Sequence, residues 1–508
     1  MNIIEQNINK INGRIDTFDR LIINGYILGL CNFRQFLFYL IQNNIMLKDF
    51  KNFALEQTSI LCDHIENYIN DCHVQLHYLS SGKIDKNLEA RKYFLDPSHT
   101  GLIAAFSVVE NCNTMTVIPN KKSKKLEIAY RPSKCKYYYF YYNDQEFGWM
   151  YLKIQTWFPY NVQIYINGRE YLSKLMDKNN IKYERYNNSF SYVENYEKAQ
   201  SLADGILSTK ISSSLDGLIK KINCHLPNIY DIFSHKYDWC IDQCEFATDI
   251  NFKSREELKS FYKTLVERTY FAFSSEDIYS FFGRNISRIH TFTKGDIVSD
   301  LRRRYQGYRI KFKINSNQIK MYDKGNNLRI EVTINNPRDF KIIKEETKDG
   351  EVTKKWKPMG KSIANMYRYA QISQSIIKRY IEALPTVEDD KATLESVKEI
   401  SEAKESKGRR YSGFNILSKG TLSLFQTIAS GEYLINGFTN KMIRQKIFKE
   451  SENPYSISKM TRILAKLKAH GIVKKVYRKN KYYLTNKGKK VTTSILLYTG
   501  KDLINAYE

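Results

Sequence analysis

The amino-acid sequence predicts an α+β fold: an N-terminal helical part, a mixed or antiparallel sheet core in two strand clusters, and a small C-terminal unit of helices and one hairpin. Apolar residues recur every three or four positions in residues 33–70, as on one face of a helix. Short β-branched and aromatic runs separated by turn residues fill residues 100–167 and 308–335. A charged segment almost free of aromatic residues, 386–410, separates this core from the C-terminal residues.

The order of elements along the chain defines the expected regions. Residues 1–95 are expected to form the helical N-terminal region. Residues 96–225 form a first α+β region, in which "GLIAAFSVV", "CKYYYFYY" and "VQIYING" are strands joined by hairpin turns. Residues 226–385 form a second α+β region with the strands "YRIKFKIN", "QIKMYDK" and "NLRIEVTIN", followed by a basic amphipathic helix. No internal repeat is visible in the sequence.

Residues 411–508 show the order helix, helix, helix, two-stranded hairpin, helix. The second helix is expected to begin at an N-cap on Thr439 or Asn440, and the third at Ser456 or Ser458. The third helix is expected in "NPYSISKMTRILAKLKAHGIV", the hairpin in "VKKVYRKNKYYLT" and the last helix in "NKGKKVTTSILLYTG". This order resembles the winged helix-turn-helix domain of bacterial transcription regulators. The resemblance implies that the helix after the turn enters the major groove and that the hairpin tip contacts DNA backbone or minor groove.

The positions that this resemblance assigns to DNA contacts carry polar or basic side chains. They are Ser458, Lys459, Thr461, Arg462 and Lys466 on the helix, and Arg478, Lys479 and Lys481 at the hairpin tip. Charge points the same way, because residues 411–508 hold 18 Lys and Arg against 5 Asp and Glu, a net of +13. The alternative is a winged helix that contacts protein.

The whole chain of 508 residues carries a formal net charge of +26. A positive field of this size favours polyanions, so DNA and RNA are the expected partners. No run of about 18 uncharged apolar residues predicts a membrane span, and the N-terminal residues lack a basic-then-apolar signal pattern. The eight cysteines lack disulfide-framework spacing and are expected to be reduced thiols in a cytoplasmic protein. No P-loop, H-E-x-x-H or G-x-S-x-G motif is present.

The two strands "QIKMYDK" and "NLRIEVTI" are separated by residues 324–327, Lys-Gly-Asn-Asn, which suit a hairpin turn. Side chains alternate between the two faces of a strand. Leu328 and the apolar residues at every second position after it therefore face a core. Lys320, Tyr322, Arg329 and Glu331 are expected together on the opposite face.

The Tyr-Asp-Lys turn at 322–324, followed by Leu-Arg-x-Glu, resembles a signature of the replication initiators of filamentous phages and rolling-circle plasmids. The resemblance implies an enzyme that nicks one DNA strand with a tyrosine nucleophile and a divalent cation. It assigns Glu331 to the metal, Arg329 or Lys320 to phosphate, and Tyr322 to nucleophilic attack. The chain has no His-hydrophobic-His triplet, the metal pair of many such enzymes.

A second group of carboxylates lies in "IDQCEFATDINF". Strand alternation would place Glu245 and Asp249 on one face. Together with Glu331 they would form a ligand set for Mg²⁺ or Mn²⁺, which prefer oxygen ligands. The alternative is a solvated or ion-paired acidic stretch.

The segment "SDLRRRYQGYRIKFKIN" is basic with interleaved tyrosines. Arg302, Arg303, Arg304 and Arg309 are expected to form a track for phosphates. The alternative is a solvated basic face.

Together these observations predict a DNA-binding protein of a mobile element, plasmid or phage. It would act as an origin- or end-binding initiator, with metal-dependent strand nicking as its candidate activity. Two alternatives stay open: a non-enzymatic winged-helix transcription regulator, and an RNA-binding protein. The oligomeric state is open, with a dimer as one option.

Overall fold

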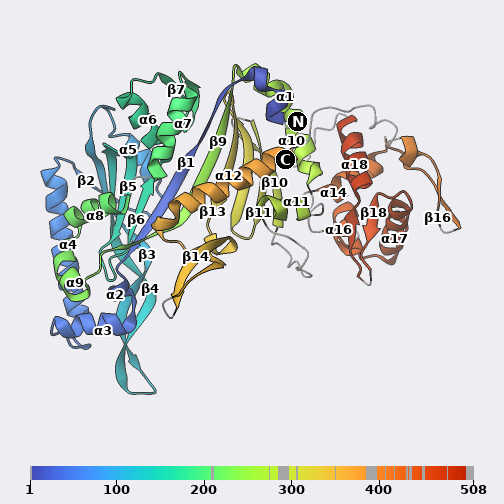
Figure 1. The fold of residues 1–508 in the computed structure, drawn as a ribbon. Coiled ribbons are helices and arrows are strands. Elements are labelled where there is room, and N and C mark those ends of the chain that lie inside the picture. The colour runs from blue at the N-terminus through green and yellow to red at the C-terminus, as the bar shows by residue number, and fades with distance from the viewer. Residues whose placement is uncertain are drawn as a thin grey trace.

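The computed structural model describes residues 3–207, 211–273, 275–283, 297–304, 307–348, 351–384, 398–406, 408–416, 418–430, 433, 437–448, 452–477 and 479–498. One long sheet runs across most of the molecule, and a separate C-terminal unit lies beyond its β10 end (Figure 1). The architecture is α+β, as the sequence predicts.

Eleven strands form the sheet. In spatial order they are β10 (Ile297–Arg304), β11 (Gly307–Ile314), β12 (Asn317–Lys324), β13 (Asn327–Ile334), β9 (Asp238–Phe252), β1 (Ile11–Tyr26), β6 (Val162–Ile166), β5 (Gly148–Gln155), β4 (Lys125–Asp144), β3 (Gly101–Asn120) and β2 (Leu76–Leu79). Neighbouring strands are antiparallel except β2 and β3, which are parallel, so the sheet is mixed.

The two halves of this sheet share one topology. Each half begins with a long strand, β1 or β9, continues through helices, and ends in a four-stranded meander. The last strand of each meander, β6 or β13, pairs with the long strand of its own half. Because β1 and β9 pair antiparallel with each other, the halves are related by an approximate twofold axis between them, although the sequence shows no repeat.

Helices cover the sheet mainly on one face. Those of the first half are α2 (Leu28–Cys31), α3 (Phe33–Gln42), α4 (Phe50–Asp71), α8 (Ile211–Ile222) and α9 (Leu226–Phe233); those of the second half are α10 (Arg255–Ala272), α11 (Ser275–Phe281) and α12 (Met366–Ala383). Their apolar side chains share one core with alternate residues of the strands, such as Phe246, Ile330 and Met321. Burial of this apolar surface is the main stabilising term for the fold.

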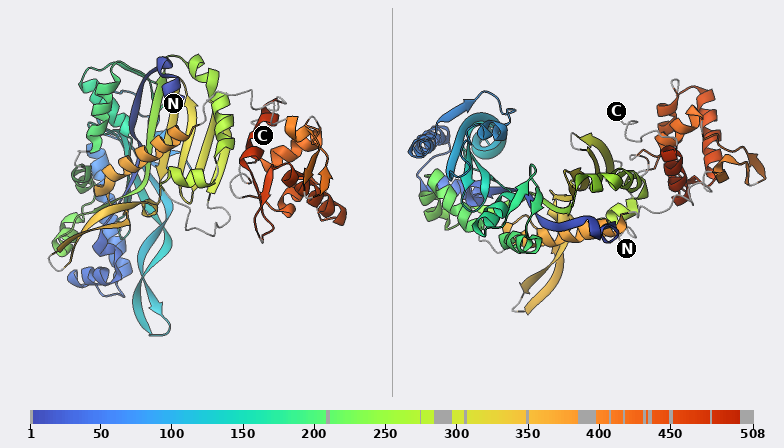
Figure 2. Two further views of the ribbon diagram at one scale, coloured as in Figure 1. Left: turned by 45° about the vertical axis from the view of Figure 1, so that its right-hand side comes forward. Right: turned by 90° about the horizontal axis from the view of Figure 1, so that it is seen from above.

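The opposite face carries fewer helices. The helices α5 (Lys86–Arg91), α6 (Gly168–Lys178) and α7 (Tyr196–Asp204) lie over the first half, and the hairpin β7 (Tyr183–Arg185) and β8 (Phe190–Val193) lies close to them. A second hairpin, β14 (Lys341–Lys348) and β15 (Glu351–Pro358), projects from the body of the protein (Figure 2). A short helix, α1 (Ile3–Gln6), precedes β1.

The N-terminal part differs from the prediction. Residues 28–71 are helical as expected, but Ile11–Tyr26 is a strand at the centre of the sheet rather than part of a helical region. The expected boundary near residue 225 does not divide the sheet. The strands of 96–225 and 226–385 belong to one sheet, and β1 joins them by pairing with β6 and β9.

The C-terminal unit contains its elements in the expected order. They are α14 (Lys419–Ile428), α16 (Asn440–Ile447), α17 (Pro454–Ala469), β18 (Val473–Lys475), β19 (Tyr482–Leu484) and α18 (Asn486–Tyr498). A short hairpin, β16 (Lys404–Ser406) and β17 (Arg409–Tyr411), occupies part of the expected linker. Assignment of this unit to the winged-helix class stays a prediction.

The helix caps of the C-terminal unit are partly as expected. Thr439 caps α16, because its hydroxyl accepts a hydrogen bond from the backbone N–H of Met442. The cap of α17 is Asn453, not Ser456 or Ser458, which lie inside the helix. Proline suits the first position of a helix because it has no N–H to leave unsatisfied, so Pro454 moves the start of α17 upstream.

Among the described residues, no helix is long and apolar enough to cross a lipid bilayer.

The close approach of α6 to β1 can be tested by a substitution at Gly168, the first residue of this helix. A Cβ atom on Gly168 would lie 2.3 Å from the backbone oxygen of Phe18. We expect Gly168→Ala to lower the free energy of unfolding by about 1–3 kcal/mol, the usual cost of overpacking. Gly217→Ala in α8 is the control, because its Cβ would meet nothing within 4 Å. That change should raise stability by up to about 1 kcal/mol; equal urea midpoints for the two variants would contradict this contact.

Candidate functional site

The β12–β13 hairpin gathers the four side chains that the sequence places on one face. Lys320 pairs with Glu331 across the two strands, and Tyr322 pairs with Arg329. The Lys320 ammonium lies 2.5 Å from Glu331 Oε1, and the Tyr322 hydroxyl donates to Glu331 Oε2 at 2.8 Å. The predicted facing of these residues is confirmed.

Two further carboxylates from the central strands join Glu331. Asp19 of β1, Glu245 of β9 and Glu331 of β13 each bring a carboxylate oxygen to within 4.8 Å of the others. Glu245 Oε1 lies 3.5 Å from the Lys320 ammonium and accepts from the Thr333 hydroxyl at 3.4 Å. We call Asp19, Glu245 and Glu331 the carboxylate cluster. It lies beside the approximate twofold axis between the two halves of the sheet.

A second set of charged side chains, Arg329, Arg169 and Asp249, lies next to the carboxylate cluster and has almost no access to solvent. The Arg329 guanidinium is fully buried and bonds Asp19. It also lies 3.5 Å from Asp249 Oδ2 and donates to the Asn188 backbone oxygen at 2.9 Å. Arg169, fully buried as well, places its Nη1 2.6 Å from Asp249 Oδ2.

Local features of the fold position these side chains. The pairing of β1 with β9 shifts register between Phe18 and Arg20. Such a bulge redirects a side chain relative to the regular alternation, and Asp19 lies within it. Asn167 caps α6 by accepting from the backbone N–H of Arg169, which fixes Arg169 in the first turn of the helix, over the sheet.

The protonation behaviour of the cluster follows from burial and from these neighbours. Burial alone would raise the pKa of Glu331, but Lys320 and Arg329 outweigh it and lower the value to about 2. Burial, together with the charge of Glu331, raises the pKa of Glu245 above its ordinary value. Burial also raises the pKa of the Tyr322 hydroxyl well above 10. Glu331 therefore stays ionised, while the pKa of Glu245 stays raised although Lys320 and Arg20 oppose the shift.

Access to solvent increases from the buried set of charges to the carboxylate cluster and its neighbours. The Arg329 and Arg169 side chains have no exposure, whereas Lys320 is 13% exposed and Arg20, whose Nε lies 3.6 Å from Glu245, is 47% exposed. The buried set of Arg329, Arg169 and Asp249 is therefore placed to stabilise the fold and not to contact a ligand. Glu245, Lys320 and Arg20 form the side through which a ligand would reach the cluster.

One predicted metal ligand occupies a different place. Asp249 lies on the same strand as Glu245, as predicted, but it pairs with Arg169 and Arg329 instead of joining the carboxylate cluster. Asp19 takes that place. Asp19 lies in "DTFDR" of β1. It was not predicted as a ligand because the N-terminal region was interpreted as helical. Asp242 is half exposed and pairs with Lys361.

The predicted basic track on β10 and β11 is partly neutralised. Asp300 pairs with Arg302 at 3.0 Å and with the buried Arg309 at 2.8 Å. Arg304 is exposed, and its guanidinium lies 5.8 Å from the centre of the Tyr322 ring. The side chain of Arg303 lies outside the described residues. Two members of the predicted track border the candidate site: Arg304, beside the Tyr322 ring, and Arg309, which pairs with Tyr322 across β11 and β12.

The predicted DNA-contacting residues of the C-terminal unit are mostly at the surface. On α17, Ser458, Lys459, Thr461 and Arg462 are exposed. At the hairpin tip, Lys479 is exposed, Lys481 is half buried, and Arg478 lies outside the described residues. Lys466 differs, because its ammonium donates to the Gly413 backbone oxygen at 2.8 Å and lies 4.1 Å from the centre of the Phe414 ring. It holds the preceding segment against α17.

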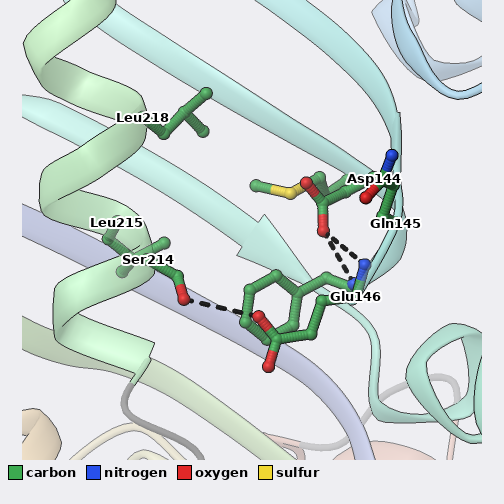
Figure 3. Close-up of a pocket in the computed structure, with 8 residues that line it drawn as sticks. Asp144, Gln145, Glu146, Ser214, Leu215 and Leu218 are labelled. Atoms are coloured by element: carbon green, nitrogen blue, oxygen red, sulfur yellow. Dashed lines mark hydrogen bonds between the residues drawn. The ribbon is translucent and has the colours of Figure 1, made fainter.

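A shallow pocket of about 280 Å³ lies elsewhere, between the β4–β5 turn and α8 (Figure 3). Its two carboxylates are already engaged. Asp144 accepts from the backbone N–H groups of Glu146 and Phe147, and Glu146 accepts from the Ser214 hydroxyl at 3.3 Å. These bonds stabilise the turn, so the pocket offers little free polar chemistry.

In comparisons with known proteins, no family model, no curated protein and no solved structure matched the chain.

The buried guanidinium of Arg329 should be essential for folding. We expect Arg329→Met to lower the free energy of unfolding by about 3–5 kcal/mol, because it leaves Asp19 and Asp249 buried with a partner removed. Arg302→Met is the matched control, since Arg302 pairs with Asp300 at a side-chain exposure of 68%. Its cost should stay below about 1 kcal/mol. Similar losses in chemical denaturation would contradict the assignment of Arg329.

Lys324, next to this network, should make stability depend on pH. Burial, reinforced by Arg329, lowers the pKa of Lys324 from 10.5 to about 8. The unfolded chain therefore binds more protons between these values, and the free energy of unfolding rises with pH in that window. Lys324→Met should be more stable than the parent at pH 7 and should lose part of the rise from pH 7 to 9.5. Parallel stability–pH curves for the two proteins would refute the lowered pKa.

Proposed function

We propose that the protein binds DNA and cuts one strand at the carboxylate cluster in a reaction that requires a divalent cation. The observation that carries the proposal is the meeting of Asp19, Glu245 and Glu331 from three adjacent strands, with the Tyr322 hydroxyl bonded to Glu331. Three carboxylates within 4.8 Å of one another attract cations, and in this structure Lys320, Arg20 and Arg329 supply that positive charge. The chain as a whole is strongly basic, with a net charge of +26, which suits a polyanionic substrate.

The cluster residues fit a hard cation such as Mg²⁺ or Mn²⁺. Carboxylate oxygens are the ligands that these ions prefer. Burial, with the charge of Glu331, raises the pKa of Glu245, and a cation bound beside it would oppose that shift. A divalent cation bound there would polarise the scissile phosphate and favour the ionised form of a nearby hydroxyl. Lys320 now occupies part of this space, 2.5 Å from Glu331, so we expect its ammonium to move toward the phosphate.

Tyr322 is the proposed nucleophile. Its oxygen would form a bond to the phosphorus while the bond from phosphorus to one sugar oxygen breaks. The proton of Tyr322 would pass to water, because Glu331, with its pKa lowered to about 2, holds a proton poorly. The sugar oxygen that leaves would take a proton from water. Arg304 and Arg329 lie 5.8 and 5.9 Å from the centre of the Tyr322 ring. The exposed Arg304 would attract the phosphate, and the buried Arg329 would stabilise the developing phenolate.

The C-terminal unit is the proposed duplex-binding part. Exposed Lys459 and Arg462 lie on α17, and Lys479 lies at the tip of the β18–β19 hairpin. Together with the resemblance of the 322–331 segment to replication initiators, this supports an initiator of a mobile element, plasmid or phage. In that role the C-terminal unit would find the site and the sheet would act on the strand.

A second candidate is a non-enzymatic regulator that binds duplex DNA. It is favoured by the ion pairs of the cluster, because Lys320, Arg20 and Arg329 together balance the charge of its three carboxylates. In this case the network serves only to hold the fold.

Incubation with supercoiled plasmid and with single- and double-stranded oligonucleotides, with and without Mg²⁺ or Mn²⁺, tests the proposal. We expect metal-dependent nicking that falls at least about 100-fold in Glu331→Gln and Glu245→Gln. Tyr322→Phe should abolish the covalent protein–DNA adduct seen on denaturing gels. Glu345→Gln on β14 is the control, because Glu345 is a strand carboxylate exposed to solvent and should cut normally.

Each outcome separates the candidates. Tight duplex binding without cleavage under any metal would favour the regulator. Cleavage that survives Tyr322→Phe but not Glu331→Gln would show that water, not Tyr322, attacks. Preference for RNA that persists after removal of residues 411–508 would favour an RNA-binding protein.

A further inference from the structure

The outer ends of β3 and β4 extend past the rest of the sheet. The pairing of β4 with β5 covers only Tyr137–Asp144, and β2 pairs with β3 only as far as Val108. Beyond these points β3 and β4 pair only with each other, as far as Asn120 and Lys125. Figure 1 shows this ribbon projecting beyond α3 at the foot of the molecule.

The base of the ribbon is tied to the core, and Val117 and Ile128, at the start of the part beyond it, still pack against that core. Met115 donates its N–H to the Phe158 backbone oxygen at 3.2 Å, and its own oxygen accepts from Trp157 Nε1 at 2.9 Å. Past this anchor, residues 116–129 form what we call the arm. Its five strand pairs run from Thr116 with Ala129 to Asn120 with Lys125.

The tip of the arm carries a concentrated positive charge. Its exposed cations are Lys121, Lys122, Lys124 and Lys125, with Arg131 and Lys134 behind them. Glu127, the one acidic residue of 111–134, accepts instead from the neutral groups of Asn120 and Ser123. In the part of the chain that the structure describes, none of these six cations forms an ion pair with a carboxylate.

The lysines sit on an ordered turn. Asn120 Oδ1 accepts from the backbone N–H groups of Lys122 at 2.8 Å and Ser123 at 3.2 Å. Lys124 has a φ of 53°, a left-handed conformation in which glycine or asparagine is easier to accommodate. The turn therefore presents its lysines from a fixed backbone.

We propose that the arm is a second DNA-contacting element, which lies in a groove of duplex DNA and binds phosphates through its tip lysines. The inference rests on the DNA-binding role proposed above and goes beyond the predicted contacts of the C-terminal unit. A two-stranded ribbon fits the major groove, which is about 12 Å wide. Five residues per strand, at about 3.4 Å each, reach about 17 Å, enough to cross the rim of the groove.

The charge of the arm also gives the exposed ribbon a source of stability. An isolated two-stranded hairpin has little core of its own and is only marginally stable in water. Leu126 is 39% exposed near the tip, so the arm does not bury its apolar side chains well. Binding to a polyanion would stabilise a segment that the fold itself does not need.

The test compares two fourfold variants of the full chain on a fluorescent duplex of about 30 base pairs. The first changes the tip: Lys121→Gln, Lys122→Gln, Lys124→Gln and Lys125→Gln. The matched control removes four lysines from the other projecting hairpin: Lys341→Gln, Lys344→Gln, Lys354→Gln and Lys355→Gln. Affinity is measured by anisotropy as a function of KCl concentration, after circular dichroism shows that both variants are folded.

We expect the tip variant to lose at least about tenfold in affinity. The slope of log affinity against log salt should become smaller by about 2–4, since each lost phosphate contact removes about 0.9. The control variant should keep most of both. In hydroxyl-radical footprinting, the tip variant should lose one protected segment while the segment protected by the C-terminal unit remains.

The possible failures are distinct. If the parent protein binds no duplex DNA, the proposed function fails and the arm proposal with it. If the parent binds and the tip variant binds with the same affinity and slope, the arm proposal alone is wrong. Equal losses in both fourfold variants would show that net charge, not the arm, sets the affinity. Arm-dependent binding to anionic vesicles or RNA, but not to duplex DNA, would overturn the proposed partner.

Discussion

The Arg329 guanidinium lies without solvent exposure among Asp19 of β1, Asp249 of β9 and the backbone oxygen of Asn188. Removing ions of this kind from water costs several kcal/mol each, and close, well-bonded partners are needed to offset it. One of those partners, Asp19, is 310 residues from Arg329 in sequence. The charge network is therefore satisfied only when both halves of the sheet have assembled. It couples the carboxylate cluster to the integrity of the whole fold.

The sequence predicted some parts of this site well. The alternation in "NLRIEVTI" correctly placed Arg329 and Glu331 on one face and Ile330 and Val332 on the other, because strand geometry is local. Lys320 and Tyr322 followed from the hairpin turn. Asp19 and Arg169 could not be found in this way. Asp19 projects from a bulge that depends on the pairing of β1 with β9, and Arg169 enters from a helix whose contact with the sheet is purely tertiary.

The fold was predictable to a similar extent. Hairpins with strong turn residues were recognised because their partners are adjacent in sequence. The strand character of Ile11–Tyr26 was missed because its partners, β6 and β9, lie more than 100 residues away. Both faces of β1 are covered by other elements, because Ile15 packs under α6 and Phe18 packs into the main core. Its polar and apolar residues therefore do not alternate simply. Local periodicity cannot show such a change of neighbours.

The central position of β1 also affects how the chain folds during synthesis. β1 is synthesised before the other strands of the sheet. Its two edges cannot form their pairs until β6 and β9, which end at residues 166 and 252, have been synthesised. At synthesis rates of about 5–20 residues per second, the last of these edges stays unpaired for more than ten seconds. An unpaired strand edge can pair with another chain. The nascent protein is thus exposed to misassociation during translation, and its yield should depend on chaperone occupancy more than on the final stability of the sheet.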